Sequence, residues 1–124
     1  MEYRLIIPGV LTSLNKYIQA ERTNRYIAAK IKRENEDAVL LAARQQLNGI
    51  KIKSPVKMDY IWIVPNGRTD RDNISFAKKF VQDALVKCGV LEDDGWNHVV
   101  GFSDRFEVDK AKPRIEVLIR EVKS

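Results

Sequence analysis

Residues 56–64 restrict the fold of this 124-residue chain more than any other stretch. From Met58 to Val64, large apolar side chains recur at every second position, which is the period of a β-strand. Towards the end of the stretch both faces become apolar, and this indicates a strand in the interior of a sheet. Pro65-Asn66-Gly67 then breaks the pattern. Such a strand needs neighbouring strands and covering helices, so the rest of the chain must supply them.

Two helical patterns flank this strand in the sequence. Apolar residues recur at helical spacing from Asn24 to Asn48 and again from Asp72 to Cys88, and a glycine follows each run. Residues 8–23 show no regular period and are expected to form a loop. We therefore predict two helices, one before and one after the interior strand.

Three further segments have the character of strands. Residues 2–7 predict a short strand that stops at Pro8-Gly9. Residues 97–108 and 115–119 flank a turn and predict a β-hairpin. The order β-α-β-α-β-β predicts a single α+β domain over residues 1–124, with two helices against a mixed sheet.

Composition narrows the functional classes. Lysine and arginine number 22 against 17 acidic residues, and the net charge of +5 favours a polyanionic partner, usually nucleic acid. No apolar run approaches the ~20 residues of a membrane span. The first residues also lack the apolar region of a signal peptide. A single cysteine, Cys88, fits a reducing compartment, so we expect a cytoplasmic protein with no membrane partner.

Acidic residues gather at both ends of the second predicted helix. Asp70 lies just before it and Asp72 at its start, and in an isolated pair of this kind Asp72 is most often a helix cap and Asp70 a turn residue. The run Glu92-Asp93-Asp94 follows it. A helix of about 17 residues is about 25 Å long. Asp94 therefore reaches Asp70 and Asp72 only if the chain doubles back beside the helix, or if a second subunit supplies the contact.

One face of this helix combines charge with aromatic rings. At about 100° per residue, Lys79 and Asp83 fall within about 20° of Asp72. Phe76 and Phe80 lie beside them on the same side. The charged pair alone would be an ordinary surface contact. Two rings on such a face indicate a second buried surface, and we predict that Phe76 and Phe80 form a dimer interface.

Carboxylates clustered in a basic chain suit one chemistry in particular. Mg²⁺ takes carboxylate oxygens together with water and phosphate oxygens, and Mn²⁺ is the alternative ion. In phosphodiester hydrolysis such an ion activates water and stabilises the leaving oxygen, and a nearby lysine neutralises phosphate charge. Six polar and basic residues, in or next to the predicted N-terminal loop and beside Asp70, are predicted DNA phosphate contacts, although each could be simple surface charge. They are Asn15, Lys16, Arg22, Arg25, Arg68 and Arg71.

Three motifs occur together in the central third of the chain. They are Asp-x-Asp-Asn at 70–73, Lys-x-x-x-Asp-Ala-Leu at 79–85, and a glycine-to-Asp-Asp spacing at 89–94. As a set they resemble the RusA family of Holliday-junction resolvases, small endonucleases often carried by phages and prophages. The resemblance implies a homodimer that nicks four-way DNA junctions symmetrically with Mg²⁺, in recombination and repair. It also implies a cytoplasmic location in a bacterial host cell.

The resemblance further implies roles for single residues. Asp70, Asp72 and Asp94 match the metal-binding aspartates of the family, and Asp93 is the alternative to Asp94. Lys79 matches the catalytic lysine by its spacing to the Asp-Ala-Leu motif. The best-known branch of the family instead places this lysine four residues after the second aspartate. Phe76 occupies that position here, and Lys78 is the other candidate.

Two other functions remain open. A non-catalytic protein that holds branched DNA would need only the basic charge, and its binding would weaken with salt. A nucleotide- or sugar-transferring enzyme could use Asp70-x-Asp72, although no glycine-rich phosphate loop accompanies it. His98 is expected to be structural, and Trp62 and Cys88 to pack in the core. Trp96 is expected to pack at the dimer interface rather than to stack on an unpaired base.

Overall fold

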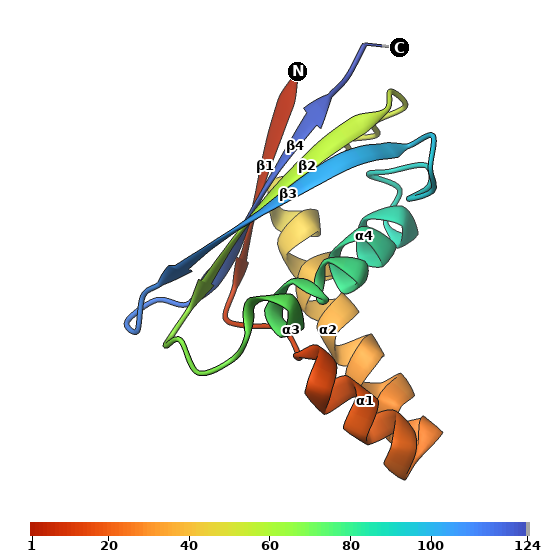
Figure 1. The fold of residues 1–124 in the computed structure, drawn as a ribbon. Coiled ribbons are helices and arrows are strands. Elements are labelled where there is room, and N and C mark those ends of the chain that lie inside the picture. Colours follow the sequence, from red (N-terminus) through yellow and green to blue (C-terminus); the bar gives the residue numbers. More distant parts are fainter. Residues whose placement is uncertain (124) are drawn as a thin grey trace.

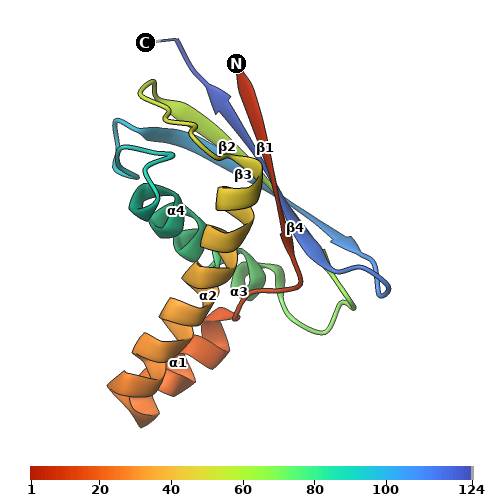
Figure 2. The same ribbon diagram turned by 180° about the vertical axis from the view of Figure 1, so that it is seen from behind.

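The computed structural model describes residues 1–123. It consists of a four-stranded sheet with helices on one of its faces (Figures 1 and 2). The fold confirms the predicted α+β class and mixed sheet, and residues 1–123 contain more helices than the two predicted. The elements are β1 (Glu2–Pro8), α1 (Leu14–Thr23), α2 (Arg25–Gln46), β2 (Val56–Val64), α3 (Arg71–Ser75), α4 (Lys78–Lys87), β3 (Val99–Val108) and β4 (Arg114–Glu121).

The strands are arranged in the order β1-β4-β2-β3. β4 runs antiparallel to both β1 and β2, whereas β3 runs parallel to β2. The prediction that residues 56–64 form an interior strand is confirmed. The predicted hairpin of β3 and β4 is wrong, because β2 lies between them. Residues 109–113 cross the end of β2, where the Asp109 N–H donates to the Val64 carbonyl at 2.8 Å.

The helical segments depart from prediction in two places. The expected loop before residue 24 contains α1, whose only buried residue is Ala20. The helix predicted from Asp72 to Cys88 is divided into α3 and α4, with Phe76 and Ala77 between them. Both linking residues keep helical backbone angles, but several hydrogen bonds there span three residues instead of four. An angular position counted along one regular α-helix is therefore shifted beyond this point.

The core lies between the sheet and the pair α2 and α4. Tyr60 and Trp62 of β2 stack there with ring centroids 5.3 Å apart. Trp62 is 2% exposed, which confirms its predicted place in the core, and Cys88 is half-buried against the same core. Trp96 is 92% exposed in the protomer, and its packing at a dimer interface stays a prediction.

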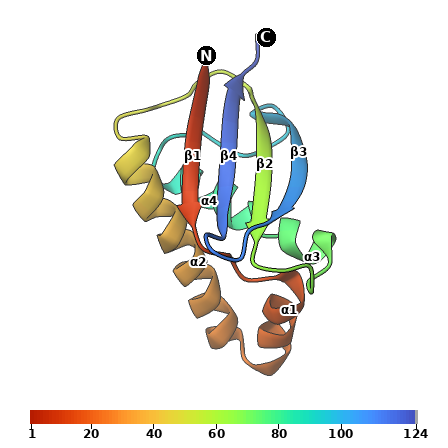
Figure 3. The ribbon, with the colours of Figure 1, turned by 90° about the vertical axis from the view of Figure 1, so that its left-hand side faces the viewer.

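The opposite face of the sheet is open. Figure 3 views this face, with the helices behind it. α1 and the first half of α2 extend beyond the end of the sheet as a helical hairpin (Figures 1 and 3). In residues 1–123, no helix has both the length and the hydrophobicity required to cross a membrane.

Candidate active site

The Asp-x-Asp segment lies where β2 ends and α3 begins. Asp70 is the N-cap of α3, and its carbonyl accepts from the N–H groups of Asn73 at 3.1 Å and Ile74 at 3.2 Å. Asp72, predicted as the cap, lies instead in the first helical turn, where its Oδ1 accepts from Asn73 N–H at 3.0 Å. Both carboxylates are exposed, and neither forms an ion pair within residues 1–123. Their oxygens are therefore available to a ligand.

Two adjoining pockets lead to these carboxylates. One, of about 330 Å³, is lined by Asp70, Asp72 and Arg71 together with residues 106–108 of β3. The other, of about 300 Å³, extends towards the start of α1 and is lined by Lys16. The pockets share Val64, Asn66, Thr69 and Ile74. The two pockets therefore adjoin each other between the base of α1 and the two aspartates.

Lys79 is the centre of a second charged cluster. Its Nζ lies 3.1 Å from Asp83 Oδ1, one turn along α4, and 3.3 Å from Asp94 Oδ2. Gly89, at φ +82°, ends α4 and allows the chain to turn back, and Leu91 then bridges to Ile52. The chain thus doubles back beside the helix, one of the two alternatives left open by the sequence, and it brings Asp94 to Lys79 instead of to Asp70 and Asp72.

The protonation of this cluster follows from its contacts. The hydrogen bond to Asp83 raises the pKa of Lys79, so the ammonium stays charged at neutral pH. Burial raises the pKa of Asp83. Burial also acts to raise the pKa of Asp94, but its hydrogen bonds with Asp83 and Lys79 outweigh this and lower it. Lys79 can therefore act as a cation, not as a base.

The neighbouring Lys78 has a different environment. Its Nζ lies 2.6 Å from Asp104 Oδ2 of β3 and 4.1 Å from the centre of the Phe102 ring. Asp104 Oδ1 also accepts from Trp62 Nε1 at 2.8 Å. The Lys78 side chain is only 17% exposed, whereas that of Lys79 is 62% exposed. Of the two candidate lysines, Lys79 is therefore accessible to a ligand, whereas Lys78 is packed against β3.

The three predicted metal ligands are not assembled in one protomer. Within the part of the chain that the structure describes, no three His, Cys, Asp or Glu side chains are grouped to hold a metal ion. Asp70 and Asp72 share one pocket, while Asp94 lies against Lys79. Asp93 is directed to His98, with 3.8 Å between its Oδ2 and Nδ1.

The predicted dimer interface needs a correction. Phe80 is only 2% exposed and belongs to the core of the protomer. Tyr17 of α1 covers both rings, with its centroid 5.7 Å from those of Phe76 and Phe80. The aromatic stripe is thus buried by α1, the segment expected to be a loop. Phe76 is half-buried against the same cluster.

The predicted DNA contacts divide into two groups, and all six are exposed. Arg68 and Arg71 flank Asp70, and Arg71 lies over the Phe106 ring at 5.8 Å. The others lie on α1 and at the start of α2: Asn15, Lys16, Arg22 and Arg25. Sequence reasoning missed Asp104. Its signal was a charge between Phe102 and Phe106 on the apolar side of β3.

A mixed sheet, an exposed pair of aspartates between β2 and α3, and a charged lysine on α4 define a small α+β domain with a polar site suited to phosphodiester chemistry. Residues 8–120 match the family model described as Endodeoxyribonuclease RusA, and the chain belongs to this family. It is accordingly an endodeoxyribonuclease of the Holliday junction resolvase type, with branched DNA as substrate. Nucleases of this family are metal-dependent. No match to the chain was found among curated proteins.

Proposed function

We propose that this chain resolves four-way DNA junctions by paired symmetric nicks with Mg²⁺ held at Asp70 and Asp72. One observation carries the proposal: both carboxylates are exposed, free of ion pairs within residues 1–123, and line one pocket with Arg71. Hard carboxylate oxygens are the donors that Mg²⁺ and Mn²⁺ take, so these residues fit such an ion. When bound, the ion would activate water and stabilise charge on the leaving oxygen.

The chain's own residues supply the remaining functions. Arg68 and Arg71 flank Asp70 in the sequence and are exposed, and we assign them the binding of backbone phosphate groups. Lys79 is charged and accessible, and we assign it the neutralisation of phosphate charge. Asp94 orients the ammonium of Lys79 through their 3.3 Å contact and is the candidate third carboxylate.

The proposal includes a homodimer. A symmetric junction needs two matched nicks, and two copies related by a twofold axis present two equivalent sites. Among the described residues of one protomer, no third carboxylate is grouped with Asp70 and Asp72 to hold a metal ion. A second subunit is a source for it. We place the dimer in the cytoplasm of a bacterial cell, where branched DNA arises in recombination and repair.

Asp72→Asn tests this function on a synthetic four-way junction, with and without Mg²⁺. The variant keeps the shape of the side chain but loses its charge, so cleavage should be abolished while junction binding survives or tightens. Asp37→Asn, at an exposed position of α2, is the matched control and should cleave like the wild type. Full activity in Asp72→Asn would contradict the proposal. Binding without nicking by the wild type, in both Mg²⁺ and Mn²⁺, would favour the non-catalytic alternative.

A further inference from the structure

The helical hairpin of α1 and α2 carries most of the charge imbalance of the chain. Residues 16–33, which we call the basic hairpin, contain one acidic residue, Glu21. They contain six basic residues: Lys16, Arg22, Arg25, Lys30, Lys32 and Arg33. The other segments together hold sixteen basic and sixteen acidic residues. The net charge of +5 is therefore located entirely on this hairpin.

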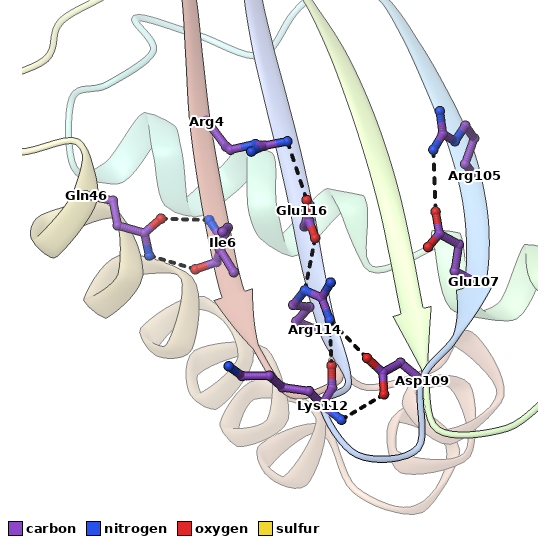
Figure 4. A network of polar contacts seen from close by, with 9 residues as sticks. All are labelled: Arg4, Ile6, Gln46, Arg105, Glu107, Asp109, Lys112, Arg114 and Glu116. Atoms are coloured by element: carbon purple, nitrogen blue, oxygen red, sulfur yellow. Dashed lines mark hydrogen bonds and ion pairs between the residues drawn. The ribbon is translucent and has the colours of Figure 1, made fainter.

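The cations of the basic hairpin are largely unpaired, in contrast to those of the sheet. Within residues 1–123, Lys16, Arg22, Arg25 and Arg33 form no ion pair. On the open face of the sheet, arginines lie against carboxylates, as Figure 4 shows for Arg114 and Glu116 at 2.9 Å. The sheet face is thus internally neutralised, whereas the hairpin presents its charge to a partner.

The tip of the basic hairpin is rigid and carries an aromatic ring. Asn24 alone joins α1 to α2, and its side-chain oxygen accepts from the Tyr26 N–H at 2.7 Å. Tyr26 is 71% exposed, and the Arg25 guanidinium lies over its ring at 5.4 Å. A large ring left in solvent beside an arginine is suited to stacking on a nucleic-acid base.

The basic hairpin also adjoins the pockets of the candidate active site. Tyr17 of α1 contacts Phe76, just beyond α3, at 5.7 Å between ring centroids. Lys16 lines the pocket that adjoins the one containing Asp70 and Asp72. DNA held by the hairpin would therefore be led towards the two aspartates.

We propose that the basic hairpin is a DNA-binding arm, and that Tyr26 at its tip stacks on a base exposed at the branch point. The arginines bind backbone phosphates of the adjoining arms and release counterions. Charge complementarity selects DNA as the occupant of this surface. The inference rests on the proposed function, because it assumes a branched DNA substrate.

The stacking role is tested with a four-way junction that carries 2-aminopurine beside the branch point, in buffer without divalent metal. The wild type should change the 2-aminopurine emission on binding. Tyr26→Ala should lose this change and weaken junction binding by about 5- to 100-fold. Tyr26→Phe should retain both, and binding to a linear duplex should be unaffected in either variant. Because Tyr26 is mostly exposed, both variants should melt at the wild-type temperature.

Arginine variants test the electrostatic role on the same helix. Arg25→Ala should reduce the slope of log Kd against log salt by about 1. Arg44→Ala, in the last turn of α2, is the control and should leave the slope unchanged. Wild-type emission and affinity in Tyr26→Ala, or equal slopes in the two arginine variants, would overturn the inference. The proposed function is tested separately, by cleavage of the junction by the wild-type protein in Mg²⁺, because the binding experiments contain no metal.

Discussion

Lys79 and Asp94 meet at 3.3 Å between Nζ and Oδ2, although α4 and a tight turn separate them in the sequence. The same ammonium lies 3.1 Å from Asp83. Its neighbour Lys78 points to Asp104 on β3 instead. Two adjacent lysines of one helix thus pair with different carboxylates. We therefore predict different roles for them.

Lys79→Ala should reduce cleavage of a four-way junction by about 100-fold, because phosphate charge then lacks its positioned cation. The melting temperature should stay close to that of the wild type, since ion pairs of an exposed lysine contribute at most about 1 kcal/mol. Single-turnover cleavage in Mg²⁺ and thermal unfolding measure the two effects.

Lys78→Ala is the matched control and should show a larger loss of stability than Lys79→Ala. Lys78 is mostly buried over Phe102, and its removal leaves the half-buried Asp104 without its cation. If both variants lost cleavage and stability to the same extent, the division of roles between the lysines would be refuted.

Glu36 and Lys87 should respond asymmetrically to substitution. Glu36 is 1% exposed on α2 and pairs with Lys87 of α4, and more weakly with Lys32 at 3.8 Å. Lys87→Met leaves the buried carboxylate with only the distant lysine and should cost about 2 kcal/mol. The double variant Glu36→Met/Lys87→Met should recover most of that loss. Urea unfolding measures the free energy of unfolding of both variants. If the losses from the two single substitutions simply add in the double variant, this account is contradicted.

Sequence alone predicts the local features of this fold well. Residues 56–64 form β2 with the predicted limits, because alternation and the following turn are local signals. The partner of a strand is not local. The turn between β3 and β4 exists, but β2 separates the two strands because its apolar faces and edges require neighbours on both sides.

The missed features depend on contacts between distant residues. α1 buries only Ala20 and is held by Tyr17 against Phe76 and Phe80, so its own sequence carries little helical signal. No glycine or proline marks the division between α3 and α4. The Asp70 and Asp72 pair is predictable from its place between strand and helix. The approach of Asp94 to Lys79 is not, since it requires the chain to fold back.

Alkaline pH should destabilise the protein partly through Tyr60. This side chain is fully buried and its hydroxyl accepts from Gln82 Nε2 at 3.0 Å, and burial raises its pKa far above the ordinary 10.0. Above about pH 10 the unfolded tyrosine ionises while the folded one stays protonated. The unfolded state then binds fewer protons, so the free energy of unfolding falls as pH rises.

Tyr60→Phe provides the check on this pH dependence. It should cost about 1 kcal/mol at pH 7, because Gln82 loses its acceptor. Its melting temperature should then decline less between pH 9 and 11.5 than that of the wild type, over a range that brackets the ordinary tyrosine pKa of about 10. Other side chains also have raised pKa values and contribute to the decline that remains: Tyr3, Tyr17, Lys79 and Lys87. Parallel curves for the two proteins would exclude Tyr60 as a source.

Phe80→Glu should unfold the protein instead of dissociating a dimer. The ring is 2% exposed and lies 5.4 Å from Phe76 and 5.7 Å from Tyr17, between centroids. A carboxylate there would be buried without a cation, which costs several kcal/mol, roughly 3 or more. Circular dichroism at 25 °C should show that the variant is already unfolded and has no cooperative unfolding transition. Leu41→Glu, at a position of α2 that is 60% exposed, is the control and should remain folded. A folded, monomeric Phe80→Glu protein would instead restore the aromatic stripe as the contact between subunits.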